Sequence, residues 1–393
     1  MIRIGARSSP LSRAQVAEVL SQLPPFEHEI IWVETFGDKD QKSSLRPLGK
    51  SDFFTRELDY MLLNREIDWA IHSAKDLPDP LPDGLKIACL TQGLDARDSL
   101  VLREGETLNS LPCGAWIATS SERREEAVRS LRNDLQFKDV RGTIHQRLHL
   151  LHTREADGVV IAEAALIRLQ LTHLNRLFLP GPTSQGQGQL ALVTRKKTLY
   201  LGLDPSRFSN AGDLIHYPII KTVPIAKLPP DIESQWDQFT HVLFTSPSAV
   251  KHWFSLCTFP LVGKIVFAIG HATQQALQSH SVESIVSQKP TQEGIVSLLQ
   301  QQNIGYLLWP RSSRSRNVVM DDLKTRKVCY MSFDLYDTMA QKIAPLPDLA
   351  EIDEIYFTSP STVDAFEEIF GSIPKNKARA IGPVTAERLF AYR

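Results

Sequence analysis

The sequence predicts an α/β protein made of several lobes with largely parallel sheets. Short apolar segments of strand length alternate with segments whose apolar residues recur at helical spacing, as Val16, Val19, Leu20 and Leu23 do. The connections between these segments are short, which is typical of α/β lobes. Polar residues gather where the strands end, and this is the edge at which such sheets bind ligands. The second half also contains an internal duplication.

Length, composition and charge fit a multidomain globular protein. The chain has 393 residues, of which 42% are hydrophobic and 23% are charged, and this length is enough for about two to four domains. The net charge of -1 provides no overall field that would attract nucleic acid or an anionic membrane. We therefore expect neither as a partner, and any anion site has to come from a local cluster of arginines.

Cysteine usage and the N-terminus predict a cytoplasmic protein. Cys89, Cys113, Cys257 and Cys329 have neither CxxC spacing nor the spacing of metal ligands, so we expect no metal site and a reducing compartment. The opening MIRIGARSSP lacks the apolar core of a signal peptide, and no apolar run approaches the ~18 residues of a membrane span.

The stretch IHSAKDLP, residues 71–78, follows a predicted helix with Phe54 and Leu58 on its apolar face, and it ends a short buried strand. His72, Lys75 and Asp76 therefore stand where the chain leaves the core, a position at which loops often carry chemistry. The alternative is a solvated turn with a Lys–Asp surface pair.

Serine and arginine follow two further strands. Ser9 and Pro10 after the strand at residues 2–5 read as an N-cap and a first helical position. In GAWIATSSERR, a strand ends at Thr119 and a helix opens with Arg123 and Arg124. Amides at a helix N-terminus, hydroxyls and guanidinium groups together form carboxylate or phosphate sites. An arginine pair there is disfavoured by the helix dipole, which favours function over the alternative of a solvated helix face.

Further arginines occupy similar positions in the segments that follow. Arg141 comes after a short strand, Arg147 lies in the next helix, and Arg168 lies in the helix after the strand at residues 158–162. The loop PTSQGQGQLALV contains Gly186 and Gly188, which we expect at positive φ or at a close backbone approach. Several arginines around one aspartate predict a cleft for a ligand that bears several carboxylates.

The motifs RIGARSSPLSRAQV, ETFGD, FFTREL, IHSAKDLP, ATSSERR, VRG-x4-R and GQGQLAL resemble, in this order, those of the hydroxymethylbilane synthase (porphobilinogen deaminase) family over residues 1–198. The resemblance implies two periplasmic-binding-protein-like lobes, about 1–92 plus 187–198 and about 93–186. It also implies a transferase that joins four porphobilinogen units and releases ammonia. Each pyrrole carries an acetate and a propionate, which accounts for the arginines.

The resemblance assigns roles by motif position. Asp76 would be the catalytic carboxylate, which stabilises the cationic azafulvene left when ammonia departs and handles pyrrole protons. The remaining matched positions would bind substrate or cofactor: Arg7, Ser9, Lys50, Ser73, Lys75, Thr119, Ser120, Arg123, Arg124, Arg141, Arg147, Arg168, Gln187 and Gly188. Around Lys50 the sequence reads Gly-Lys-Ser-Asp, one residue off the Gly-Lys-Gly of the family.

The sequence departs from this family in one respect that concerns its cofactor. The family has a third domain in which a Gly-Gly-Cys loop attaches a dipyrromethane, and no such loop is recognisable here, since Cys89 and Cys113 lie in other segments. Dipyrromethane is expected from the family, but its attachment cysteine is not recognisable. Another anchor, non-covalent binding and loss of turnover all stay open. An alternative is that the first half only binds pyrrole carboxylates, and another is a non-enzymatic anion-binding protein.

The second half contains two similar segments. HVLFTSPSAVKHWF aligns with EIYFTSPSTVDAFEEIF, and VFAIGHATQQAL aligns with RAIGPVTAERL. Each copy predicts a strand, a Thr-Ser-Pro-Ser turn, a helix, and then a strand, Ile-Gly and a helix. Serine before proline again fits an N-cap, so two facing lobes would present two anion-binding turns. The alternative is that each turn is only a good cap.

These segments, with GYLLWPRSSRSRNVVMDDL, KVCYMSFDLYDT and LIHYPIIKTVPI, resemble the uroporphyrinogen-III synthase family over residues 199–393. The resemblance implies two Rossmann-like lobes, about 199–226 plus 338–393 and about 227–337, and a lyase that closes hydroxymethylbilane to uroporphyrinogen III. Tyr336, expected at the end of a strand, would help the hydroxyl leave. The other expected site residues are Thr245, Ser246, Ser248, Thr273, Arg311, Thr358, Ser359 and Thr385.

Overall fold

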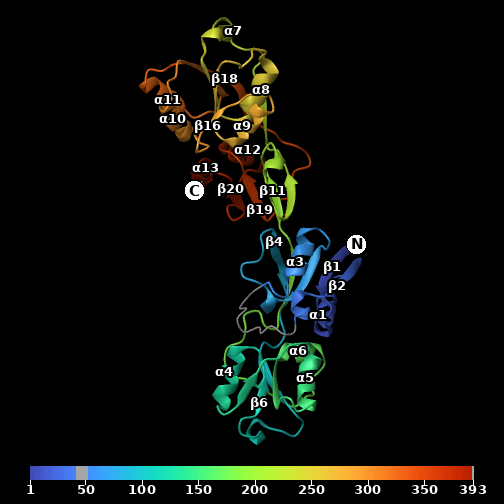
Figure 1. Ribbon diagram of the computed structural model, residues 1–393. Helices are drawn as coiled ribbons and strands as arrows, with labels where there is room; N and C mark the ends of the chain where they lie inside the picture. Colours follow the sequence, from blue (N-terminus) through green and yellow to red (C-terminus); the bar gives the residue numbers. More distant parts are fainter. Residues whose placement is uncertain (41–51, 392–393) are drawn as a thin grey trace. The chain divides into compact units, whose positions relative to one another are not determined.

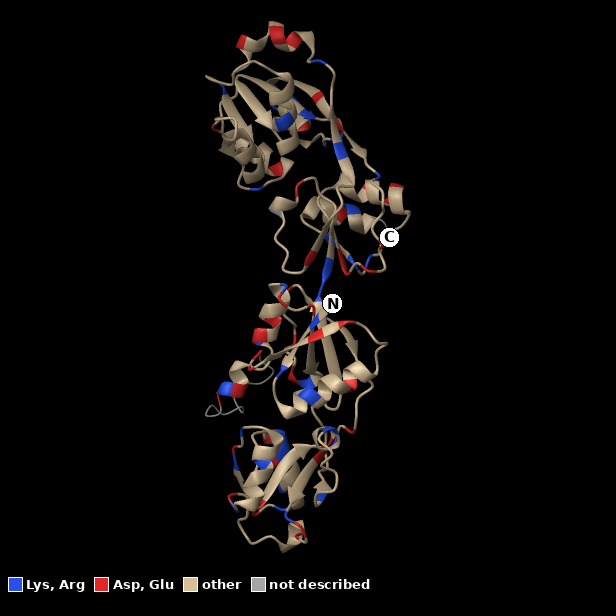
Figure 2. Ribbon diagram, turned by 90° about the vertical axis from the view of Figure 1, so that its right-hand side faces the viewer, with Lys and Arg blue, Asp and Glu red and all other residues tan. Residues whose placement is uncertain are grey.

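The computed structural model describes residues 1–40 and 52–391 and forms two compact units (Figure 1). The first unit comprises Met1–Thr198 and Ser209–Leu214, and the second comprises Leu199–Phe208 and Ile215–Arg393. Both are α/β, as the alternation of strands and helices predicts. Within the described ranges, no helix is long and apolar enough to cross a membrane. Basic and acidic positions are interspersed along both units (Figure 2).

The first lobe of the first unit is a five-stranded sheet in the order β2-β1-β3-β10-β4. Strands β2, β1 and β3 are parallel, and β10 runs antiparallel to both β3 and β4, so the sheet is largely parallel as predicted. Its elements are β1 (Ile2–Arg7), α1 (Pro10–Ser21), β2 (His28–Val33), α2 (Phe36–Lys39), α3 (Arg56–Leu63), β3 (Trp69–Ser73), β4 (Leu85–Leu90) and β10 (Leu190–Arg195).

Local sequence accounts for the helix boundaries in this lobe, with two differences from the prediction. Ser9 caps α1 as expected, since its hydroxyl accepts a hydrogen bond from the amide of Ser12 at 3.2 Å. The helix ends at Ser21, before Leu23, because prolines follow directly and the residue before a proline avoids the helical region. Phe54 precedes α3 instead of lying on it, and its ring packs against Phe53.

The second lobe is a five-stranded sheet in the order β7-β6-β8-β5-β9. Here β7, β6 and β8 are parallel, and β5 is antiparallel to β8 and β9. Its elements are β5 (Asp98–Leu102), β6 (Trp116–Ala118), α4 (Glu122–Leu131), β7 (Gln136–Lys138), α5 (Ile144–His152), β8 (Gly158–Ala162), α6 (Glu163–Arg168) and β9 (Arg176–Phe178). The chain passes between the two lobes at residues 91–97 and again at residues 179–189.

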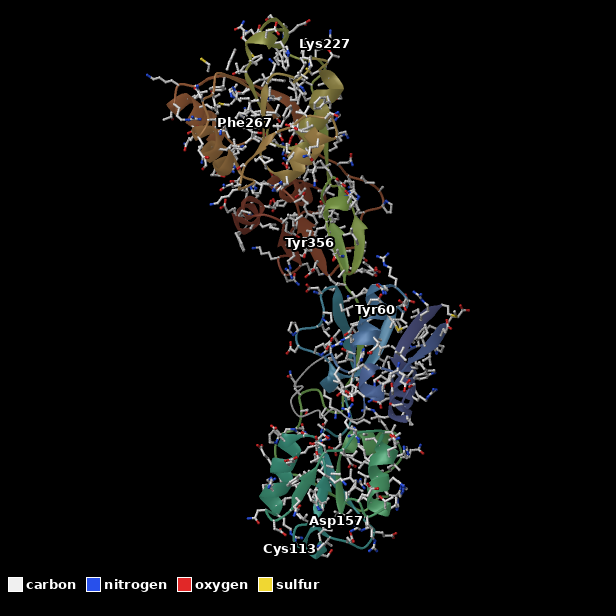
Figure 3. The ribbon with its side chains drawn as sticks, viewed as in Figure 1. Tyr60, Cys113, Asp157, Lys227, Phe267 and Tyr356 are labelled. Atoms are coloured by element: carbon white, nitrogen blue, oxygen red, sulfur yellow. The ribbon has the colours of Figure 1, made fainter. Side chains whose placement is uncertain are left out.

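The second unit contains a six-stranded sheet in the order β13-β18-β17-β14-β15-β16. Buried aromatic residues such as Phe267, labelled in Figure 3, fill its core. The elements of this lobe are β13 (Ile220–Pro224), α7 (Pro230–Ser234), β14 (His241–Phe244), α8 (Pro247–Leu256), β15 (Ile265–Ala268), α9 (His271–Gln278), β16 (Ile285–Val286), α10 (Gln292–Gln300), β17 (Tyr306–Ser312), α11 (Val318–Thr325) and β18 (Cys329–Ala340).

A smaller four-stranded sheet, in the order β12-β11-β19-β20, lies alongside. Its elements are β11 (Lys197–Tyr200), β12 (Asp213–His216), β19 (Glu354–Phe357), α12 (Pro360–Phe370), β20 (Ala378–Ala380) and α13 (Pro383–Ala391). Tyr356, labelled in Figure 3, lies on β19. The duplication is visible in these elements, because β14 with α8 and β15 with α9 correspond to β19 with α12 and β20 with α13.

The two Thr-Ser-Pro-Ser turns have the predicted local structure. The hydroxyl of Ser246 accepts a hydrogen bond from the amide of Ala249 at 3.0 Å, and that of Ser359 accepts one from the amide of Thr362 at 3.3 Å. Each serine is followed by a proline at the first helical position. Both hydroxyls are therefore engaged in capping their own helices.

Two boundaries in this unit differ from the prediction. The prediction assigned residues up to 226 to the smaller lobe, but β13 pairs with β18 in the six-stranded sheet. Tyr336 was expected at a strand end, yet it lies inside β18, a strand of 12 residues. Both differences have one cause, because β18 pairs with β17 up to Tyr336 and with β13 from Tyr336 onward.

Candidate active site

A cavity of about 420 Å³ lies in the first unit and is lined by both lobes. Its charged lining includes Arg7, Lys75, Asp76, Arg124, Arg141 and Arg147, together with Glu34 and Asp38. A smaller cavity of about 70 Å³ shares Arg7, Ser9, Lys75 and Asp76 with it and adds Ser73, Arg168, Gln187 and Gly188. The structure thus brings most of the expected residues of this half together around Asp76.

The sheet topology explains this convergence. β1 and β3 are parallel neighbours, so the residues at their carboxyl ends, Arg7 to Ser9 and Lys75 to Asp76, meet at one edge of the sheet. One turn of 3₁₀ helix, Ala74–Asp76, carries Lys75 and Asp76 directly after β3. The second lobe adds Arg141 from the segment between β7 and α5, and Arg147 from α5 itself.

Three cations in this lining form no ion pair within the described part of the chain. Lys75 donates from Nζ to Oε1 of Gln187 at 3.2 Å, and Arg147 donates from Nε to the carbonyl oxygen of Gly142 at 2.9 Å. Arg141 donates from Nη2 to the carbonyl oxygens of Gly37 and Asp40 at 2.8 and 2.6 Å. The Nη1 atom of Arg141 is buried and has no hydrogen-bond partner among the described residues. It is therefore a donor that could bind an acceptor on a ligand.

The electrostatics of these cations show that they repel one another. Burial, followed by the neighbouring guanidinium of Arg124, lowers the pKa of Lys75 to about 8. Burial, followed by Arg124 and Arg141, lowers the pKa of Arg147 to about 10. A bound carboxylate would relieve both effects, since an opposite charge nearby favours the protonated form.

Other expected arginines already have carboxylate partners. Arg7 makes a forked ion pair with Asp38, and the ring of Phe54 lies under its guanidinium at 4.5 Å. Although burial alone would raise the pKa of Asp38, its bonds from Arg7 and Thr35 hold it below the usual value. Arg168 pairs with Glu18 at 2.7 Å and also donates to the carbonyl oxygen of Gly188 at 2.8 Å. Bound ligand carboxylates would have to compete with these resident ones.

Three expected residues of the first half do not reach the cavities. Arg123 pairs with Asp98 at 2.6 Å and is absent from the lining of either cavity. Ser120 donates to the carbonyl oxygen of Val140 at 2.9 Å and so joins two loops, whereas Thr119 accepts from the amide of Ser121 at 3.3 Å within its own loop. Lys50 lies outside the described residues.

Sequence reasoning missed the acids that pair with the arginines. Asp38, Glu18 and Asp98 each hold at least one expected ligand-binding arginine. Asp38 is part of the family motif ETFGD, but the motif did not indicate that Asp38 pairs with Arg7. His72, which drew attention in the sequence, is buried in β3, and burial, followed by Arg7, lowers its pKa to about 4. Its ring is therefore neutral near pH 7.

Gly188 must stay glycine for the cavity edge to keep its shape. It has a φ of +92°, and a Cβ there would lie 2.4 Å from the carbonyl oxygen of Leu94. Gly188→Ala is expected to lower the free energy of unfolding by more than ~1 kcal/mol, because alanine at positive φ is strained and the backbone oxygen must also move. Urea unfolding measures this loss.

Gly105→Ala is the matched control for Gly188→Ala. Gly105 has a φ of +77°, but no atom lies within 4 Å of the Cβ position, so it reports backbone strain without the clash. An equal loss of stability in both variants would contradict the close approach inferred at Gly188.

The second unit brings one pair of expected residues into contact. The hydroxyls of Tyr336 and Ser246 are 2.8 Å apart, and burial raises the pKa of Tyr336. Thr245 accepts a hydrogen bond from Nε1 of Trp309 at 3.3 Å, Ser248 lies in the first turn of α8, and Thr273 is buried on α9.

The remaining expected residues of this unit are dispersed or already paired. Thr358, Ser359 and Thr385 belong to the smaller sheet and its helices. The basic segment at the end of β17 and in the loop after it is largely neutralised, because Arg311 pairs with Asp334 at 3.1 Å and Arg316 pairs with Glu293 at 2.7 Å. This loop is therefore weaker as an anion site than its arginines suggested.

In comparisons with known proteins, each half of the chain matches a different family model. Residues 2–201 match the family model described as "Porphobilinogen deaminase, dipyromethane cofactor binding domain". Residues 209–392 match the model described as "Uroporphyrinogen-III synthase HemD".

Curated relatives agree with the first of these matches. The porphobilinogen deaminase of Deinococcus radiodurans is 40% identical over 207 residues, covering 49% of this chain and 66% of that protein. The porphobilinogen deaminase of Caldicellulosiruptor saccharolyticus is 39% identical over 208 residues, covering 51% and 71%. The chain therefore spans just under two thirds of the length of the first relative. The solved uroporphyrinogen-III synthetase of Helicobacter pylori is 19% identical to this chain, and the match covers 50% of this chain and 89% of that one. Its TM-score is 0.36, so no structural argument is built on this match.

Proposed function

Because this chain belongs to the porphobilinogen deaminase family, we propose that its first unit joins four porphobilinogen units into hydroxymethylbilane with release of ammonia. We propose further that its second unit closes hydroxymethylbilane to uroporphyrinogen III, and that the protein works in the cytoplasm. One observation carries the proposal for the first unit: three cations that have no carboxylate partner among residues 1–40 and 52–391 line one cavity together with Asp76.

The chemistry of the lining suits this substrate. Every porphobilinogen brings two carboxylates, and Lys75, Arg141 and Arg147 are donors in a partly desolvated cluster, where charge-assisted hydrogen bonds are strong. Guanidinium groups bind carboxylates in a forked geometry that also fixes the orientation of the pyrrole ring. Because these groups stand around Asp76, they would hold the reacting carbon of the substrate beside that carboxylate.

Asp76 has two tasks in this proposal. Departure of ammonia leaves a positive charge on the pyrrole, and a carboxylate already fixed beside it stabilises that charge as it develops. The same carboxylate is placed to accept a pyrrole proton once the new carbon–carbon bond has formed. The surrounding cations bind the acidic side chains and so hold the substrate in one orientation beside Asp76.

The lining also suits the dipyrromethane that the family model names. Lys75, Arg141 and Arg147 would hold its acidic side chains, and when bound this group supplies the pyrrole to which the first unit is added. None of the four cysteines lines either cavity. Cys113 lies at the far end of the second lobe, opposite the first lobe (Figure 3). The residues therefore fit the carboxylates of the group and offer no cysteine beside them for its attachment.

The full chain incubated with porphobilinogen tests this proposal. We expect consumption of porphobilinogen with one ammonia released for each pyrrole, and a product that oxidises to the type III porphyrin. Mass spectrometry of the purified chain should show a pyrrole adduct under native conditions that disappears on denaturation. Closure of supplied hydroxymethylbilane without any consumption of porphobilinogen would instead favour a first unit that only binds pyrrole carboxylates.

The pKa of Lys75 makes substrate affinity depend on pH. Burial and Arg124 lower this pKa to about 8, so the ligand-free protein loses the ammonium charge as the pH rises through that value. The dissociation constant for porphobilinogen is therefore expected to rise above about pH 8. Calorimetric titration between pH 6.5 and about 9.5 measures it. In Lys75→Met the affinity should be lower and the step near pH 8 should vanish, and persistence of that step would contradict the assignment.

Tyr336 is the proposed acid of the second unit. Tyr336→Phe removes the hydroxyl that contacts Ser246 and is expected to slow formation of uroporphyrinogen III by about 10²-fold, the usual range for general acid catalysis. The ratio of type III product to product closed without ring inversion measures the effect. Tyr306→Phe is the control, because its hydroxyl donates to Gln235 in the same lobe at 3.0 Å. Equal ratios in the two variants would remove Tyr336 from the mechanism.

A further inference from the structure

Asp98 is a buried acid at which four donors from two segments meet. It is the first residue of β5, directly after the chain has crossed from the first lobe, and only 3% of it is exposed. Oδ1 accepts hydrogen bonds from Nε and Nη2 of Arg124 at 3.0 and 2.7 Å and from Nε2 of Gln187 at 2.9 Å. Oδ2 accepts one from Nη2 of Arg123 at 2.6 Å. Both oxygens of the carboxylate are thus engaged.

These bonds join the two segments that connect the lobes. Gln187, in the return segment 179–189, donates from Nε2 to Asp98 and also to the carbonyl oxygen of Ala96, at 2.6 Å, in the outgoing segment 91–97. Arg123 donates from Nη1 to the carbonyl oxygen of Pro182, at 2.6 Å, in the return segment. Asp98 therefore links the first turn of α4 to both connections.

The same bonds lead to the cavity. Because both hydrogens of the Gln187 amide are taken by Asp98 and Ala96, its Oε1 is directed to Nζ of Lys75, which donates to it at 3.2 Å. Arg124 lines the larger cavity, and Gln187 lines the smaller one. Asp98 lines neither cavity. It acts on Lys75 through the hydrogen bonds of Gln187 and through its own negative charge, which opposes the lowering of the Lys75 pKa by burial.

We infer that Asp98 is a positioning residue of the deaminase site, which holds Arg124 at the cavity wall and, through Gln187, holds the ammonium of Lys75 beside Asp76. The inference rests on the proposed function of the first unit. It also gives Arg123 a role different from the one its sequence suggested, because Arg123 completes the coordination of Asp98 and holds the return segment.

The alternative is that Asp98 only stabilises the fold as a buried partner of arginines. Asp157 is the control for this alternative. Asp157 belongs to the same lobe, accepts from Nη2 of Arg103 at 2.9 Å and from the amide of Trp116 at 2.9 Å, and lines neither cavity. It lies at the end of this lobe away from the first lobe (Figure 3). Loss of Asp98 removes the ion pairs of Arg123 and Arg124, and loss of Asp157 removes one of the two ion pairs of Arg103, which also pairs with Glu106 at 3.0 Å, so both changes should destabilise the lobe.

The test compares Asp98→Asn, Asp98→Glu and Asp157→Asn in the full chain. Calorimetry gives the dissociation constant for porphobilinogen, and NMR of labelled lysine gives the pKa of Lys75. We expect Asp98→Asn to weaken porphobilinogen binding by at least about tenfold, the size expected for one charge-assisted bond, and to lower the pKa of Lys75. Asp157→Asn should leave the dissociation constant within about twofold of that of the unchanged protein and should leave the pKa of Lys75 unaltered. Asp98→Glu should restore part of the affinity that Asp98→Asn loses.

Equal effects of Asp98→Asn and Asp157→Asn, or unchanged binding in Asp98→Asn, would overturn the inference. Should Asp98→Asn fail to fold, Gln187→Met removes the connection between Asp98 and Lys75, together with the bond to Ala96, and leaves the arginine pairs of Asp98 in place. A Lys75 pKa unaltered by Gln187→Met would also overturn the inference. Failure of the proposed function has a different signature, because the unchanged protein would then neither bind nor consume porphobilinogen. The titration of Lys75 in the variants would still report on Asp98.

Discussion

Asp76→Asn is expected to reduce porphobilinogen consumption by about 10³-fold, the upper range for loss of one group that stabilises developing charge. The asparagine keeps the shape of the side chain and removes the negative charge on which the departure of ammonia depends. Binding should persist, because the cations that hold the substrate carboxylates stay in place. The rate of ammonia release measures the loss, and calorimetry with porphobilinogen measures the binding.

Asp83→Asn is the control for this change. Asp83 is an exposed residue of the same lobe and lines neither cavity. Its substitution should leave ammonia release unaltered. Turnover in Asp76→Asn equal to that of the control would refute the catalytic role of Asp76.

Arg147→Gln is expected to lower kcat/KM for porphobilinogen by about 10²-fold, the upper range for a hydrogen bond to a charged group. The loss should fall mainly on KM, since Arg147 holds the substrate without touching the reacting carbon. The free energy of unfolding should not fall, because burial and the neighbouring Arg124 and Arg141 already disfavour a charge at this position. Steady-state kinetics and urea unfolding measure the two quantities.

Arg129→Gln is the control for Arg147→Gln. Arg129 lies on α4 in the same lobe, and its guanidinium stands over the ring of Phe137 at 4.5 Å. It should leave the kinetics unaltered. A parallel loss of stability and of activity in Arg147→Gln would contradict a binding role, since it would mean that Arg147 supports the fold.

Features fixed by neighbouring residues were predictable from the sequence. Ser9, Ser246 and Ser359 cap helices as expected, because an N-cap depends only on its own hydroxyl and on the amide three residues later. Gly186 and Gly188 have φ values of +74° and +92°, as their role in a tight loop predicted. The alternation of strands and helices likewise sufficed for the α/β class.

The partner of each arginine was not predictable. Arg168 meets Glu18 across 150 residues of sequence and from the other lobe, and Arg123 meets Asp98 across 25 residues within the second lobe, so both pairings depend on the tertiary fold. By motif position alone, Arg123 and Arg168 look like the arginines that are available to bind a ligand. In the structure, each of the two already forms an ion pair with a carboxylate of the protein. Only the fold separates them from Arg141 and Arg147. Tyr336 was misplaced for a similar reason, since the length of β18 depends on the strands on either side.

A crystal structure of the full chain with porphobilinogen bound is the most direct test of the central claim, that a cation-lined cavity holds carboxylated pyrroles against Asp76. We expect substrate carboxylate oxygens within about 3 Å of donors on Lys75, Arg141 and Arg147, and the pyrrole nitrogen facing the carboxylate of Asp76. Porphobilinogen bound elsewhere, or bound in this cavity with its carboxylates turned away from these three cations, would contradict the claim.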